Sequence, residues 1–207
     1  MALTEVPASP PNPEVASVMT LADFLAYDNG TDARYELEDG VLHHMPTESE
    51  LNCLITSFLF SHFLKVGIPF SWLRTKTEIA VSGFRATVRL PDLMILSDEL
   101  VEALRGSPRS LITLDMPPPR LVVEVVSPGQ ENIDRDYRYK RSQYEARGIP
   151  EYWIVDPLLA QVTVLSWENG LYEAAVFRGT EPIQSHLLQE FSQGSLLRVD
   201  DVLKVAV

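Results

Sequence analysis

The sequence predicts an α/β fold in which a mixed central sheet is flanked by helices and carries additional β-hairpins. Residues 121–126, LVVEVV, form an almost continuous apolar run, which is typical of a strand covered on both faces. Residues 133–146 repeat apolar side chains at helical spacing. Asp39-Gly40 and Glu168-Asn169-Gly170 each separate two strand-like runs, and such turns favour hairpins because glycine tolerates a positive φ.

Length and composition indicate one ordinary globular domain. The chain has 207 residues, 45% of them hydrophobic and 22% charged, close to the averages for globular proteins. We expect residues 1–17, which are rich in proline and small polar side chains, to form a flexible N-terminal arm, and residues 18–207 to form a single domain. The arm lacks the basic and apolar regions of a signal peptide, and no apolar run approaches the roughly 20 residues that cross a bilayer, so a cytoplasmic protein is expected.

The formal net charge of −12 argues against one class of function. Proteins that hold a phosphate backbone usually display a basic face, whereas this chain has 17 Lys and Arg against 29 Asp and Glu. Tight non-specific binding to DNA is therefore not expected. A nuclease remains compatible with this charge, because a metal-binding pocket is itself acidic and the substrate can be bound locally.

The first part of the chain predicts two helices and a hairpin. A short helix is expected over 19–27, beginning at the cap residue Thr20, and the hairpin covers 35–45. A largely buried helix is expected over 50–66. The lone cysteine, Cys53, falls within this helix, so we expect a small core residue that forms no internal disulfide.

Strands dominate the rest of the prediction. Pro91 lies inside one expected strand and should sit at a bulge or a sheet edge, because proline donates no hydrogen bond to a ladder. A short helix and a loop are expected over 97–120, and strand and loop in the remainder to Val207. The expected strands are 72–81, 86–96, 121–126, 151–155, 162–167 and 171–177.

Glu124 is the first residue that the fold alone does not explain. A carboxylate inside an apolar strand either meets a compensating cation or costs roughly several kcal/mol as an unpaired buried ion. The alternatives are an edge strand that lets Glu124 reach solvent, or a structural ion pair.

Asp92 is a second acid at the entry to an apolar strand. It follows Pro91, which can set a local bend that turns the next side chain toward a cleft. A turn-capping aspartate is the simpler alternative, because aspartate is common in turns.

Lys140 is a cation on the inward face of a predicted helix. Ile133, Tyr137, Lys140 and Tyr144 follow the 4, 3, 4 spacing that places side chains on one helix face. A lysine buried beside carboxylates is well placed for chemistry. The alternative is a surface pair with Asp136, four residues earlier, with the lysine stem lying over apolar neighbours.

Glu36 and a histidine pair lie on the first expected hairpin. Glu36 and Glu38 share one face of their strand, and either could simply be solvated. His43 and His44 are adjacent on a strand, so they point to opposite faces and cannot easily share a metal ion. We therefore interpret both histidines as structural.

Together these residues resemble the PD-(D/E)XK nuclease superfamily, specifically the Uma-type family of putative restriction endonucleases, over roughly residues 18 to 200. The resemblance rests on separate segments whose joint order is specific. They are Arg34-Tyr-Glu-Leu-Glu-Asp-Gly-Val41, Arg89-Leu-Pro-Asp-Leu93, Leu121-Val-Val-Glu-Val-Val-Ser-Pro128, Asp136-Tyr-Arg-Tyr-Lys140 and Tyr144-Glu-Ala-Arg-Gly-Ile-Pro-Glu-Tyr-Trp-Ile-Val-Asp-Pro157.

The resemblance implies a restriction-endonuclease-like fold and a metal-dependent active site. It implies that Asp92 and Glu124 hold Mg²⁺ or Mn²⁺, that Glu36 completes the acidic cluster, and that Lys140 serves as the catalytic lysine. DNA is the implied substrate, hydrolysed at its phosphodiester bonds, and a homodimer would suit cleavage of both strands.

The chain departs from the family pattern at two positions. The superfamily lysine ordinarily follows the second acid by two residues, where this chain has Val126, so the resemblance implies that Lys140 replaces it. Leu51 follows Glu50, where many relatives look to have histidine.

Two other classes of function compete with a nuclease. A non-catalytic protein that keeps the fold for partner or regulatory binding fits the net charge and the absent strand lysine. A hydrolase using Cys53 or a serine has little support, because no Gly-x-Ser-x-Gly elbow is present.

Overall fold

The strands form two mixed sheets, and the chain passes from one sheet to the other across residues 90–92. The computed structural model describes residues 18–28, 30–31, 33–45, 47–191 and 196–205, so the arm expected over 1–17 lies outside the described residues. Sheet A has the order β2(Val41–His44), β1(Tyr35–Glu38), β5(Thr87–Arg89), β4(Glu78–Val81), β7(Leu111–Ile112). Sheet B has the order β11(Leu171–Arg178), β10(Gln161–Glu168), β9(Glu151–Asp156), β8(Leu121–Val125), β6(Leu93–Ile95), β3(Leu73–Arg74). The α/β class with flanking helices and hairpins is confirmed, but the single central sheet of the prediction is two sheets.

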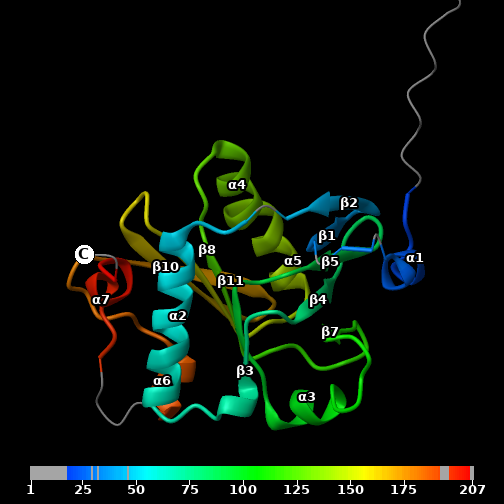
Figure 1. Ribbon diagram of the computed structural model, residues 1–207. Helices are drawn as coiled ribbons and strands as arrows, with labels where there is room; N and C mark the ends of the chain where they lie inside the picture. The colour runs from blue at the N-terminus through cyan, green and yellow to red at the C-terminus, as the bar shows by residue number, and fades with distance from the viewer. Residues whose placement is uncertain (1–17, 29, 32, 46, 192–195, 206–207) are drawn as a thin grey trace, which may run out of the picture.

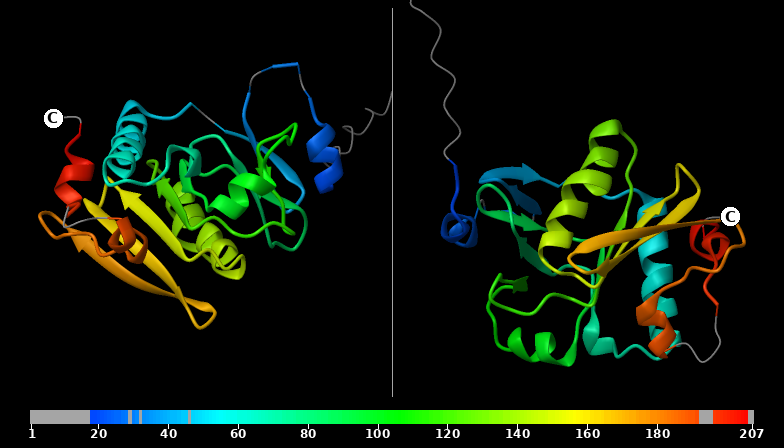
Figure 2. Two further views of the ribbon diagram at one scale, coloured as in Figure 1. Left: turned by 90° about the horizontal axis from the view of Figure 1, so that it is seen from below. Right: turned by 180° about the vertical axis from the view of Figure 1, so that it is seen from behind.

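Helices cover both faces of sheet B. The helix α2(Glu50–Lys65) lies on one face, and the helical run α4(Gln130–Asp134), η2(Arg135–Lys140), α5(Arg141–Ala146) lies on the other (Figures 1 and 2). Val123 and Val125 pack with the buried side chains of α2, whereas Val122 packs with those of α5. This alternation follows from the two-residue period of a strand, and it makes β8 buried on both faces.

A smaller hydrophobic core lies between α1 and sheet A. The short helix α1(Leu21–Ala26) contributes Phe24, which packs against Leu37 and Val88 of the sheet. Thr20 caps this helix: its hydroxyl oxygen accepts a hydrogen bond from the Asp23 backbone N–H, and the Asp23 carboxylate accepts one from the Thr20 N–H. The predicted cap is therefore confirmed, with the reciprocal bonds of a capping box.

The two predicted hairpins are present with the expected turns. Asp39 and Gly40 have φ values of 47° and 83°, and they join β1 to β2. Asn169 and Gly170 have φ values of 53° and 95°, and they join β10 to β11. Positive φ at both central residues identifies a turn whose twist matches that of the flanking strands.

Four local predictions are wrong. The strand expected over 72–81 is two short strands in different sheets, β3 in sheet B and β4 in sheet A. The strand expected over 86–96 is also two short strands in different sheets, because Pro91 interrupts the ladder where the chain passes from sheet A to sheet B. The C-terminal remainder contains the helices α6(His186–Phe191) and α7(Val199–Leu203), which are too short to show a clear period in the sequence. Cys53 is exposed rather than a core residue, because it lies on the outward face of α2.

The remaining helical elements are α3(Asp98–Ala103) and the 3-10 turn η1(Phe70–Trp72). None of the helices in the described ranges is both long and apolar enough to cross a membrane.

Candidate active site

Glu124 lies in the interior of sheet B. Its strand β8 is flanked by β6 and β9, so it is not an edge strand, and the side chain is 3% exposed. Because Glu124 is one residue from Val123 and Val125, it points away from α2 and toward the helical run over residues 130–146. The alternative of a solvated edge glutamate is therefore wrong.

Asp92 lies beside Glu124 on the neighbouring strand. Antiparallel pairing of β6 with β8 matches Leu93 to Val123, and continuing this register by one residue places Asp92 opposite Glu124. Its Oδ2 accepts a hydrogen bond of 2.6 Å from the Val125 backbone N–H. Two acids far apart in sequence thus meet at the point where the chain enters sheet B.

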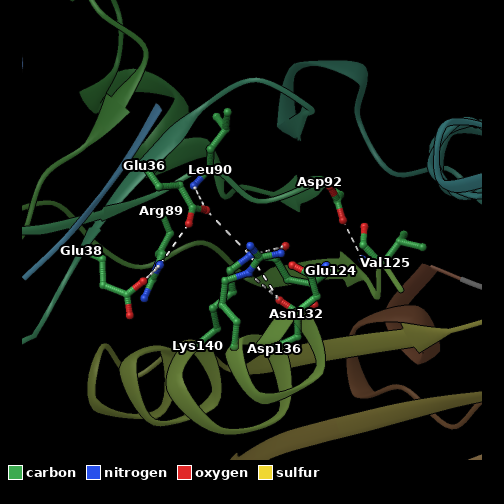
Figure 3. A network of polar contacts seen from close by, with 12 residues as sticks. Glu36, Glu38, Arg89, Leu90, Asp92, Glu124, Val125, Asn132, Asp136 and Lys140 are labelled. Atoms are coloured by element: carbon green, nitrogen blue, oxygen red, sulfur yellow. Dashed lines mark hydrogen bonds and ion pairs between the residues drawn. The ribbon is translucent and has the colours of Figure 1, made fainter. Parts of the chain in front are cut away.

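Lys140 reaches these acids from the helical layer. Its Nζ lies 2.8 Å from Glu124 Oε2, 3.4 Å from Asp136 Oδ1 and 3.8 Å from Glu36 Oε1 (Figure 3). The side chain is 2% exposed, so its ammonium is held by carboxylates rather than by water. The predicted contact with Asp136 exists, but it is buried and not a surface pair.

Glu36 joins the cluster from sheet A. The register that matches Leu37 to Val88 brings Glu36 opposite Arg89, whose Nη1 lies 3.0 Å from Glu36 Oε2. The other oxygen of Glu36 accepts a hydrogen bond of 3.0 Å from the Leu90 N–H. Arg89 also contacts Glu38 at 2.9 Å. Glu36 is consequently enclosed by two cations, Arg89 and Lys140.

A wide helical turn sets the inward face that carries Lys140. Residues Arg135–Lys140 form a π-helix, a conformation found mostly as single turns and frequently at functional sites. The fully buried positions are Asp136, Lys140 and Tyr144, whereas Ile133 and Tyr137 are only partly buried. The predicted inward face is therefore shifted on this turn. The wider turn places the buried residues four apart, at 136, 140 and 144, instead of at the predicted spacing of 4, 3, 4.

Three members of the cluster were missed by sequence reasoning. Tyr144 donates a hydrogen bond of 2.7 Å from its hydroxyl to Glu124 Oε1, and Asp136 and Arg89 are the other two. Arg89 carried a usable signal, because it is a charged residue in the apolar strand that precedes Pro91. Glu124 was recognised by the same signal in its own strand. Asp136 also carried a signal, the four-residue spacing to Lys140, but the sequence analysis weighed that pair only as a surface contact.

Burial dominates the pKa shifts of two of the acids. Burial raises the pKa of Asp92 to about 6 although Lys140 opposes the shift, and burial likewise raises the pKa of Glu124. For Glu36, Lys140 and Arg89 outweigh burial and hold the pKa below its ordinary value. Burial would lower the pKa of Lys140, but Glu124 and the neighbouring acids raise it, so the amine stays protonated.

An open pocket leads to Asp92. It has a volume of about 420 Å³, and its lining includes Arg34, His44, Glu48 and Cys53 as well as Asp92. Asp92 is thus the member of the cluster through which a ligand in this pocket would reach the buried acids.

The donors fit a hard divalent cation that keeps much of its water. Across the described parts of the chain, no three His, Cys, Asp or Glu side chains converge as a ready set of ligands. Mg²⁺ is usually bound through one or two carboxylates, with water and substrate phosphate completing its shell. Asp92 and Glu124, whose pKa values are raised by burial, could supply those carboxylates. Both oxygens of Glu36 already accept from Arg89 and the Leu90 N–H, and those of Glu124 contact Tyr144 and Lys140, so the role of each acid as a metal ligand stays a prediction.

Comparisons with known proteins identify the family and support the fold. The model of the Uma2 family, described as "putative restriction endonuclease", matches residues 21–200. A crystal structure described as a putative nuclease belonging to DUF820, from Anabaena variabilis ATCC 29413, superposes with a TM-score of 0.66. That chain is 17% identical, and the match covers 91% of the present chain and 99% of the other. The search of curated proteins found no match.

Proposed function

The chain belongs to the Uma2 family of putative restriction endonucleases, and from this premise we propose that it is a metal-dependent endonuclease that hydrolyses phosphodiester bonds in DNA. The observation that carries the proposal is the contact of 2.8 Å between Lys140 Nζ and Glu124 Oε2, beside the carboxylate of Asp92. A buried lysine beside two acids, one of which lines a pocket, is a set of groups suited to phosphodiester hydrolysis.

Under this proposal Asp92 and Glu124 bind Mg²⁺ or Mn²⁺. The bound cation would polarise a phosphate oxygen and lower the pKa of a water molecule. Asp92 faces the pocket, so its carboxylate orients the incoming group, whereas Glu124 lies deeper and is fixed by the Tyr144 hydroxyl. These contacts hold the two acids in place before substrate binds.

Lys140 supplies a fixed positive charge in the same scheme. Its raised pKa keeps it an ammonium at neutral pH, so it stabilises charge that develops on the phosphate and orients the attacking water. Glu36 and Asp136 restrain the ammonium from the sides that Glu124 leaves open. Arg89 in turn restrains Glu36, which makes it a positioning residue rather than a catalytic one.

Plasmid cleavage tests this assignment. We expect the protein to nick or linearise supercoiled plasmid with Mn²⁺, and Asp92→Asn and Lys140→Met to reduce the rate by about 100-fold or more, the usual effect of removing one stabilising group. Lys65→Met, an exposed lysine at the end of α2, is the matched control and should cleave like the wild type. Equal cleavage by all four folded proteins would reject the site.

A non-catalytic binding or regulatory protein is the alternative function. The net charge of −12 and Val126 in place of the strand lysine favour it, and each Glu124 oxygen already has a partner. Calorimetric titration discriminates between the two. Heat of binding with millimolar Mg²⁺ or Mn²⁺ that disappears in Asp92→Asn favours the nuclease, and its absence from the wild type favours the binding protein.

We also propose a homodimer, which would bring one active site to each strand of a duplex. Trp167 and Val176 share one face of the hairpin formed by β10 and β11, and they are 41% and 42% exposed, so this face suits a two-fold contact. Sedimentation equilibrium of the wild type and Val176→Glu tests this: a dimer that the substitution dissociates is expected, and a wild-type monomer would reject it.

A further inference from the structure

A second pocket adjoins the pocket that contains Asp92. Its volume is about 340 Å³, and the two pockets share Ala33, Arg34 and Leu90 in their linings. The second pocket lies between α1 and sheet A, and its lining includes Tyr27, Tyr35 and Lys76. We name it the flanking pocket. The two pockets are therefore neighbours, and a polymer bound in the Asp92 pocket can extend to the flanking pocket.

Aromatic rings follow this path from one pocket to the other. The rings of Tyr27 and Tyr35 lie 5.5 Å apart, and those of Tyr35 and His44 lie 5.4 Å apart, both pairs edge to face. The tyrosines line the flanking pocket, and His44 lines the Asp92 pocket. Tyr27 is 39% exposed, so part of its ring is open to a ligand. Successive aromatic side chains along a groove are typical of surfaces that stack unpaired bases.

Cations accompany these rings despite the acidic composition of the chain. Lys76 is exposed at the flanking pocket, and no ion pair of its side chain is found within the described residues. Arg34 lies in both pockets and contacts Glu48 at 3.3 Å.

The partly buried acid of the flanking pocket is already neutralised. Arg109 holds Glu78 through two hydrogen bonds of 2.6 and 2.7 Å and also lies over the Phe24 ring. Asp28, at the rim, accepts a hydrogen bond from the Gly30 N–H within its own turn. The positive charge of Lys76 is therefore available to a phosphate locally, and Arg34, whose ion pair with Glu48 is exposed, can exchange that partner for a phosphate.

We propose that the flanking pocket binds an unpaired nucleotide next to the scissile phosphate, with its base against Tyr27 and its phosphate at Lys76 and Arg34. This inference rests on the proposed nuclease function and narrows its substrate to DNA with a single-stranded segment at the cleavage point. Stacking uses the π face that every base presents, so the subsite is tolerant of sequence.

Binding in EDTA tests the subsite apart from catalysis. Fluorescence polarisation would measure a labelled 12-nucleotide single strand and its blunt duplex at two salt concentrations. Tyr27→Ala should weaken single-strand binding about 10-fold, as loss of one stacked base does. Lys76→Ala should reduce the slope of log K against log salt by about 0.7, the effect of one phosphate contact on a single strand. Phe70→Ala and Lys65→Ala, exposed residues outside both pockets, are the matched controls.

The outcomes separate this subsite from the active site. Loss of single-strand binding in Tyr27→Ala but not in Phe70→Ala supports the subsite even if the wild type cleaves no plasmid. Three results overturn it: no single-strand binding by the wild type, equal binding by Tyr27→Ala and Phe70→Ala, or equal losses on single strand and duplex. A failed nuclease is recognised independently, as intact binding without cleavage in Mn²⁺.

Discussion

Replacement of Arg89 by methionine should destabilise the protein by an amount that depends on pH. Arg89 is 1% exposed and contacts Glu36, which is 2% exposed, at 3.0 Å. Without the guanidinium, Glu36 keeps the Leu90 N–H and a contact of 3.8 Å with Lys140. Glu38, which is 30% exposed, can turn to solvent. The loss of stability is therefore concentrated in the carboxylate of Glu36.

The magnitude has a ceiling, because a buried carboxylate can take up a proton instead of remaining charged. The ordinary pKa of Glu36 is 4.5, two and a half pH units below pH 7, and each unit corresponds to about 1.4 kcal/mol. Protonation of Glu36 in the folded Arg89→Met variant should thus cost at most about 3.4 kcal/mol at pH 7 and less than about 1 kcal/mol at pH 5, and the stability that the lowered pKa of Glu36 gives the wild type is lost in addition.

The sign follows from proton linkage. In the wild type the pKa of Glu36 is held low by Lys140 and Arg89 against burial, so the carboxylate adds stability above its ordinary pKa that is lost as pH falls through the folded value. In Arg89→Met the folded pKa rises instead, so the folded state binds the additional proton and the variant loses stability as pH rises. The difference between the two proteins must therefore grow between pH 5 and pH 7.

Urea unfolding at pH 5, 6 and 7 measures this difference, and Glu36→Gln supplies the control. In the Arg89→Met background, Glu36→Gln removes the titrating group, so the pH dependence of the difference should vanish. A loss that is the same at pH 5 and pH 7, or that persists unchanged in the double variant, would refute the assignment of the destabilisation to Glu36.

Three further predictions follow from single contacts. Tyr144→Phe removes the hydrogen bond to Glu124 and should lower the free energy of unfolding by about 1.5–3 kcal/mol in urea, as for other bonds to charged groups; no change would contradict the contact. Cys53 should react in the native state with a maleimide, more slowly at neutral pH than an ordinary thiol because its surroundings and Glu48 raise its pKa, and faster as pH rises because the thiolate is the reactive form; the label should block plasmid cleavage because the thiol lines the 420 Å³ pocket, and full activity after labelling would oppose this. Gly40→Ala should lower the melting temperature more than Gly67→Ala, because both have positive φ but only at Gly40 would a Cβ meet a side-chain atom at 2.3 Å; equal shifts would contradict it.

Local elements could be predicted from the sequence wherever a few neighbouring residues determine the conformation. The turns at Asp39-Gly40 and Asn169-Gly170 depend on backbone φ at those residues alone, and the Thr20 cap depends on Asp23 three residues later. The division of the strands into two sheets is not determined by neighbouring residues. It depends on which partner each short strand finds across the chain, and Pro91 indicates only that a ladder is interrupted there.

The candidate site was predictable where burial conflicts with charge. Glu124 and Lys140 were selected because each is an ion at a position that the pattern buries, and the structure joins them at 2.8 Å. Asp136 was interpreted as a surface residue because the spacing assumed a regular helix, whereas the π turn brings it to the inward face. Arg89 satisfies the same criterion as Glu124, so applying the criterion to every strand would have found it.

The site can lack a lysine on strand β8 because Lys140 supplies the ammonium from the helical layer. Residue 126 lies two positions after Glu124 and so shares its side of the strand, but it is Val126, 1% exposed, packed in the cluster with Tyr144. A lysine side chain is long and flexible, so its ammonium can reach one point from a neighbouring helix as well as from the strand. The helix delivers it here because β8 points Glu124 at the helical layer and the π turn directs Lys140 back toward the sheet. The cluster therefore requires a cation at a point in space, and the fold allows that cation to come from more than one position in the sequence.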